Sequence, residues 1–131
     1  SLLALSLLFA SQALAKAEEI LLQSVQSGMY VTVVDGMLAA AARGPRGASR
    51  FETVRLEGDR VALRDTRSGS YVRAGVGQGT FLATGSPHIR GWEMFRMSRL
   101  PGGSVAIRSE QNGKLVRAGV GHGSRLAAVA G

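Results

Sequence analysis

Short runs of alternating apolar and polar residues follow one another along most of the chain. Val61–Asp65, Tyr71–Ala74 and Phe81–Ala83 are three such runs, and Gly91–Met97 follows as a fourth after a polar loop. Glycine, serine, asparagine and proline separate the runs, and no helical period stands out after residue 19. Strands of about 4–6 residues bounded by such turn residues are typical of a closed all-β fold.

The pattern occurs three times along the chain. Residues 72–83 recur closely as residues 116–127, and a fainter copy lies between residues 20 and 40. The period of roughly 40 residues indicates a repeat architecture. It is marked by three glycines in matching turns, Gly28, Gly69 and Gly113. Three repeats of about four strands each predict a β-trefoil, in which half of the strands close a barrel and half form hairpins that cap it.

Two strand motifs are shared between repeats. The second strand reads Gly-x-Tyr-Val-x-Ala over residues 69–74 and Gly-Lys-Leu-Val-Arg-Ala over residues 113–118. The fourth strand reads Trp-Glu-x-Phe over residues 92–95, with Phe-Glu-x-Val over residues 51–54 as a weaker match in the first repeat. From about Ile20 to the end, these motifs resemble the fascin-like β-trefoil family. The resemblance implies the trefoil fold and, as one possible function, binding to actin filaments.

The repeats also predict a core. Equivalent residues of the first and second strands are expected to be buried around a pseudo-threefold axis: Leu22, Leu63 and Ile107, and Val31, Val72 and Val116. A core position is one that every repeat must fill, because an unfilled core position leaves a destabilising cavity.

Trp92 and its neighbour Glu93 need a separate interpretation. Trp92 is expected to pack the base of the barrel, since Phe51 holds the matching repeat position, although stacking on a sugar is an alternative. Glu93 and Glu52 are expected to be half-buried clamps that accept hydrogen bonds from loop amides, because a buried carboxylate needs donors. Two catalytic acids are excluded here, because the repeat symmetry places these residues far apart. The ricin-type Gln-x-Trp signature is absent from both positions.

The two ends of the chain carry their own signals. Leu2–Ala10 is an apolar run, and Ala13-Leu-Ala15 has the small residues of a signal peptidase site. We therefore expect residues 1–15 to be a signal peptide and residues 16–131 to be one mature domain beginning at Lys16. A buried helix or a membrane anchor is the alternative, but the run is short for a spanning helix.

The third repeat stops before its fourth strand, so we expect a domain that is incomplete at its C-terminus and open at one barrel edge.

Composition limits the chemistry. The chain has no cysteine, which excludes cysteine nucleophiles and cysteine–zinc clusters. The net charge of +7 comes almost entirely from arginine, and it favours anionic partners or serves only solubility. His88 and His122 lack ligand partners at metal spacing, and neither glycine loop fits a phosphate-binding motif. We therefore expect no metal, no cofactor and no catalytic residues.

The hairpin loops are the predicted binding site. Gly75–Gly79 and Gly119–Gly123 are expected to be hairpin tips. Polar residues repeat beside them, and these are the candidate ligand-binding residues: Arg73, Gln78, Arg117 and His122. The first repeat has Thr32 in place of arginine and a loop about three residues shorter, so no third site is expected there. Ordinary turn residues are the alternative interpretation.

The function expected from these features is that of a secreted or periplasmic binding module without catalytic activity. A polysaccharide or other glycan, anionic in one version, is the favoured partner, and actin filaments are the alternative. A trefoil protease inhibitor would need an exposed reactive loop, for which Ala42–Gly47 is a glycine-rich candidate. Neither specific nucleic-acid binding nor a membrane span in the mature domain is expected.

Overall fold

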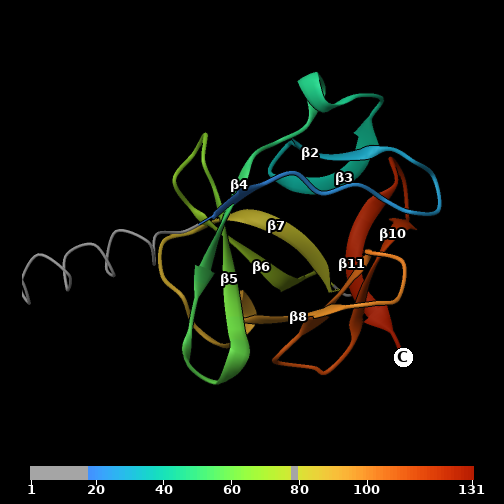
Figure 1. Ribbon diagram of the computed structural model, residues 1–131. Helices are drawn as coiled ribbons and strands as arrows, with labels where there is room; N and C mark the ends of the chain where they lie inside the picture. Colours follow the sequence, from blue (N-terminus) through green and yellow to red (C-terminus); the bar gives the residue numbers. More distant parts are fainter. Residues whose placement is uncertain (1–17, 78–79) are drawn as a thin grey trace, which may run out of the picture.

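The computed structural model describes residues 18–77 and 80–131, so the expected signal peptide at residues 1–15 lies outside the described residues. The first repeat contains β1 (Glu18–Ile20), β2 (Tyr30–Val34), β3 (Met37–Ala42) and β4 (Phe51–Arg55). The second contains β5 (Arg60–Asp65), β6 (Tyr71–Val76), β7 (Phe81–Ser86) and β8 (Phe95–Arg99). The third contains β9 (Val105–Ser109), β10 (Leu115–Val120) and β11 (Arg125–Ala130) (Figure 1). Three 3₁₀ turns join them: η1 (Pro45–Gly47), η2 (Glu57–Asp59) and η3 (Gly91–Glu93).

The three repeats are related by a pseudo-threefold arrangement. The backbone amides of Ala40, Thr84 and Ala128 hold matching positions, and each donates to a carbonyl of another repeat's hairpin at 2.8–3.1 Å. Strands β1, β4, β5, β8 and β9 form the barrel, and the hairpins β2–β3, β6–β7 and β10–β11 cap it. The predicted β-trefoil is therefore confirmed, with eleven strands in the described ranges. Within those ranges, no helix is long and apolar enough to cross a membrane.

The hairpins differ in length as the sequence predicts. In β2–β3, the two-residue turn Asp35–Gly36 has positive φ at both residues, 52° and 78°, which is the geometry of a tight hairpin turn. Thr32 pairs with Ala39 there, whereas Arg73 pairs with Ala83 ten residues further along β6–β7. The first hairpin is therefore three residues shorter than the second.

Three of the six predicted core residues are buried, and the other three are only partly buried. Of the six predicted core residues, Val31, Leu63 and Val72 are buried. Leu22, Ile107 and Val116 are only half-buried, although they pack against the core cluster. The prediction of six buried residues is wrong for these three. They belong to the first and third repeats, between which no described barrel strand lies.

The predicted correspondence between Phe51 and Trp92 is wrong. Phe51 pairs with Asp65 and Phe95 pairs with Ser109, and both phenylalanines are completely buried. Phe51 is therefore the counterpart of Phe95. The two motifs look alike three residues out of register, because an aromatic residue precedes glutamate in both.

The fourth strand of the second repeat begins later than the sequence suggests. The run Gly91–Met97 was expected to be one strand, but Gly91–Glu93 forms η3 and β8 begins at Phe95. Glu52 lies within β4 and pairs with Arg64 on β5, so it is a cross-strand ion partner and does not clamp a loop amide. With Phe51 matched to Phe95, Ala48 takes the place of Trp92 in the first repeat.

Candidate functional site

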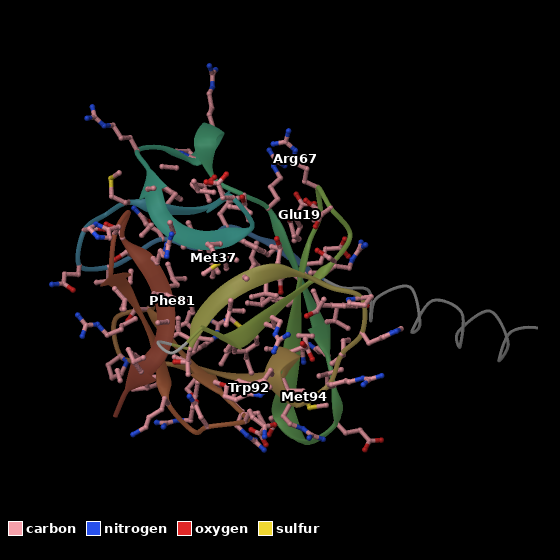
Figure 2. All side chains as sticks on the ribbon, turned by 180° about the vertical axis from the view of Figure 1, so that it is seen from behind. Glu19, Met37, Arg67, Phe81, Trp92 and Met94 are labelled. Carbon is pink, nitrogen blue, oxygen red and sulfur yellow. The ribbon has the colours of Figure 1, made fainter. Side chains whose placement is uncertain are left out.

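The three hairpins meet at the outer end of the barrel and present one residue each. Met37, Phe81 and Arg125 begin β3, β7 and β11 and hold the same repeat position. Figure 2 shows Met37 and Phe81 at the starts of β3 and β7. Each precedes a buried leucine, and side chains alternate along a strand, so these three face outward from the core. We call Met37, Phe81 and Arg125 the cap centre.

An aromatic ring and a cation lie together at the cap centre. The guanidinium carbon of Arg125 lies 5.5 Å from the centroid of the Phe81 ring, within the range of a cation–π contact. The turn of the third hairpin passes close to the ring, since a Cβ added at Gly121 would lie 3.6 Å from Phe81 Cζ. His122 follows Gly121 and is exposed. The cap centre therefore combines an apolar ring with exposed donors.

The structure describes three of the four predicted ligand-binding residues and places them in different surroundings. Gln78 lies outside the described residues. His122 is exposed in the turn beside the cap centre, and Arg117 is exposed on β10. Arg73 is half-buried, and its Nε lies 4.0 Å from Glu93 Oε2. Although they hold equivalent positions, Arg73 and Arg117 therefore lie in different surroundings.

Glu93 anchors the turn η3 and is itself buried. Its carboxylate accepts hydrogen bonds from the Arg90 backbone amide at 2.8 Å and from the Ser86 hydroxyl at 2.9 Å. The expectation that Glu93 clamps a loop amide is confirmed. The clamp holds Trp92 against β6, where a Cβ added at Gly75 would lie 2.8 Å from the indole. This packing agrees with a structural role for Trp92.

A cleft of about 260 Å³ lies on the side of the third hairpin. Its wall includes Ser24, Gln26 and Ser27 from the turn before β2, and Arg117, Ala118 and Gly119 from β10. Polar side chains line the cleft along this turn, and Gly119 contributes only backbone on the side of β10.

Ionisable groups elsewhere form local pairs. Arg96 donates to Glu110 at 2.7 Å, and this hydrogen bond lowers the pKa of the Glu110 carboxyl and raises the pKa of Arg96. Arg96 lies on β8, and Glu110 lies in the turn directly after β9. Over residues 18–77 and 80–131, no group of three or more histidine, aspartate or glutamate side chains could hold a metal ion.

The sequence interpretation missed Phe81 and Arg125. A signal for them is present, because Met37, Phe81 and Arg125 each stand directly before a Leu-Ala pair. Strand alternation places the leucine inside and the preceding residue outside. Differences in residue type at this position hide the equivalence.

The comparisons with known proteins define the fold and leave the family open. No family model matches the chain, and no curated protein matches its sequence. Among solved structures, the designed threefold-symmetric protein ThreeFoil superposes with a TM-score of 0.73 at 14% identity, over 86% of this chain and 89% of ThreeFoil. A GH43 β-1,3-galactosidase gives 0.72 at 14% identity, over 86% of this chain. Cry35Ab1 gives 0.61 at 14% identity, over 88% of this chain.

The chain spans only part of two of these proteins. It covers 24% of the galactosidase and 32% of Cry35Ab1. At such low identity, the likeness establishes the β-trefoil fold alone.

Proposed function

We propose that this protein is a non-catalytic binding module whose cap centre binds a glycan. The observation that carries the proposal is the Arg125 guanidinium placed over the Phe81 ring where the three hairpins meet. An aromatic ring offers an apolar face on which the C–H face of a sugar ring can pack. The guanidinium beside it offers several N–H donors for hydroxyl or acidic groups.

Two further features support this choice. The chain carries a net charge of +7, which favours acidic glycans over neutral ones. The likeness to a trefoil part of a GH43 β-1,3-galactosidase supports a carbohydrate-related role without specifying a ligand.

The proposal includes export to the periplasm or cell exterior, on the basis of the signal-like residues 1–15. The exported chain is then expected to begin at Lys16, which mass spectrometry of the exported protein would measure.

A glycan array, followed by titration of the best ligand, tests the cap centre. Phe81→Leu keeps an apolar side chain but removes the aromatic face, and Arg125→Ala removes the cation. Each variant is expected to weaken binding by about tenfold, the equivalent of about 1.4 kcal/mol. Arg55→Ala is the matched control, because Arg55 is exposed at the end of β4, far along the chain from all three hairpin turns, and its loss changes the net charge equally.

Salt dependence and thermal melting complete this test. For an acidic glycan, affinity is expected to fall as salt rises, because screening weakens exposed charge pairs. The melting temperatures of Arg125→Ala and Arg55→Ala should stay close to that of the parent. If Phe81→Leu and Arg125→Ala bind the ligand as tightly as Arg55→Ala does, the cap centre is not the glycan site.

Actin-filament binding is the second candidate function. It follows from the fascin-like strand motifs and is favoured by the net charge of +7, since arginine-rich surfaces attract acidic proteins. Co-sedimentation with filaments at low and physiological salt separates it from the first proposal. A protein that sediments with filaments at physiological salt and ignores every glycan would favour this alternative.

A further inference from the structure

Each of the three hairpins carries a valine directly before its turn. The valines end β2, β6 and β10: Val34, Val76 and Val120. Each pairs across its hairpin with one residue of the cap centre. Directly paired residues of antiparallel strands place their side chains on the same face of the sheet, so the valines lie beside the cap centre on its outward side. We call these three valines and the three cap-centre residues the hairpin face.

The hairpin face is apolar at five of its six positions, and the core does not require these side chains. Val34 is 48% exposed, and the other four apolar residues are partly exposed. None of the five belongs to the core cluster or to the hydrophobic residues that pack against it. A contiguous apolar patch on the surface is typical of an interaction site.

The hairpin face is suited to a flat partner. The three valines hold equivalent positions around the pseudo-threefold axis, and three equivalent points around an axis lie in one plane perpendicular to it. Each cap-centre residue pairs with a buried alanine of another repeat: Met37 with Ala83, Phe81 with Ala127, and Arg125 with Ala39. The apolar side chains are therefore held around one axis by the pairing between repeats.

Arginines surround the apolar side chains. Arg73 lies in the same cross-strand row as Met37, with one alanine between them. Arg117 lies in the same way in the row of Phe81. Two strand spacings amount to about 10 Å, so each arginine lies just outside the apolar residues. Arg125 lies within the face, with its guanidinium 5.5 Å from the centroid of the Phe81 ring.

The charge of the hairpins is almost entirely of one sign. Asp35, in the turn of the first hairpin, is the only acidic residue in the sequence of the three hairpins, residues 30–42, 71–86 and 115–130. A symmetric dimer through the hairpin face would bring the same arginines of both copies together, because a two-fold interface uses one surface patch twice. An anionic lipid bilayer instead offers a flat apolar layer beneath negative headgroups, which complements both features.

We propose that the hairpin face is a peripheral membrane-binding surface for bilayers with anionic headgroups. The three valines, Met37 and Phe81 enter the boundary between headgroups and acyl chains, and the arginines contact the lipid phosphates. The Asp35 carboxylate opposes binding, because it lies at the tip of the first hairpin among negative headgroups. The proposal goes beyond the glycan site and does not rest on it, since the valines lie outside the cap centre.

Sedimentation of the full chain with lipid vesicles tests the proposal. Vesicles of phosphatidylcholine with roughly one third phosphatidylglycerol should bind at least about tenfold more tightly than pure phosphatidylcholine, and salt should weaken this binding. Val34→Asp should weaken it at least about fivefold, because it puts a charge in the apolar layer. Leu100→Asp is the matched control, since Leu100 is 45% exposed in the turn between β8 and β9. All variants keep residues 1–15, so any contribution of that apolar run cancels in the comparison.

Removal of the Asp35 charge should have the opposite effect. Asp35→Asn is expected to tighten binding to the anionic vesicles several-fold, because it removes the repulsion at the tip. Asp59→Asn is the matched control, as Asp59 is exposed in η2 between two barrel strands. Both aspartates have positive φ, 52° and 62°, a conformation that asparagine also adopts. Asp59→Asn should leave binding close to that of the parent.

A fluorescent label reports the contact directly. The chain has no cysteine, so Val34→Cys and Leu100→Cys each accept one environment-sensitive fluorophore. Anionic vesicles should shift the emission to the blue for the label at position 34 and leave it unchanged at position 100. Val34→Thr combined with Val120→Thr keeps the β-branched shape, and it should weaken vesicle binding even if Val34→Asp lowers the melting temperature.

Three results would overturn the proposal. One is an equal loss of vesicle binding in Val34→Asp and Leu100→Asp, and another is an equal emission shift for the two labels. The third is a dimer of the chain alone, by analytical ultracentrifugation, that Val34→Asp converts to monomer, which would assign the face to a second copy. The glycan proposal fails separately, because Phe81→Leu keeps an apolar side chain and should lower glycan affinity while leaving vesicle binding close to that of the parent.

Discussion

Leu63→Ala is expected to lower the free energy of unfolding by about 2–5 kcal/mol, the usual cost of truncating a fully buried leucine. Leu63 has no exposed surface and belongs to the central core cluster, with β4 paired along its strand. The loss combines the transfer free energy of the removed methyl groups with the cavity left in a barrel that cannot collapse around it. Urea denaturation followed by fluorescence of Trp92 measures the change.

Two other leucines provide the controls. Leu22 is the repeat counterpart of Leu63 but is only half-buried, so Leu22→Ala should cost clearly less. Leu100 is 45% exposed, and Leu100→Ala should cost below about 1 kcal/mol. Should Leu63→Ala fail to fold, Leu63→Val with an expected cost of about 1 kcal/mol takes its place. Equal costs for the three alanine variants would contradict the assigned core.

The repeat pattern was sufficient to predict the fold. Strand alternation and matching glycines gave the three hairpins, and the pairs Thr32–Ala39 and Arg73–Ala83 confirm the predicted difference in loop length. Burial was harder to predict, because it depends on neighbouring strands as well as on the residue itself. Leu22 and Leu63 have the same place in the repeat, yet only Leu63 has a strand on each side.

The candidate site was less predictable, because equivalent residues acquired different neighbours. Arg73 and Arg117 stand in nearly identical sequences, but η3 brings Glu93 to Arg73 and no described segment does so for Arg117. The contact between Phe81 and Arg125 joins two repeats and depends on the meeting of hairpins far apart in sequence. Within a single strand, alternation indicates only that each faces outward.

Gly75→Ala is expected to be one of the most destabilising glycine-to-alanine substitutions in this chain. Gly119→Ala is its matched control. Both glycines have positive φ, 85° and 79°, so alanine at either position carries a backbone strain of about 1 kcal/mol. At Gly75 the new Cβ would also lie 2.8 Å from Cδ2 and 2.9 Å from Cε3 of Trp92. Overpacking of this kind costs about 1–3 kcal/mol more, because the indole must leave its place over β6.

A double-mutant cycle with Trp92 isolates the steric part of this cost. In a Trp92→Ala background, Gly75→Ala should cost no more than Gly119→Ala does in the parent, because only the backbone strain remains. Thermal unfolding followed by circular dichroism measures all four variants without relying on tryptophan fluorescence. Equal costs for Gly75→Ala and Gly119→Ala in the parent would mean that Trp92 does not pack on β6.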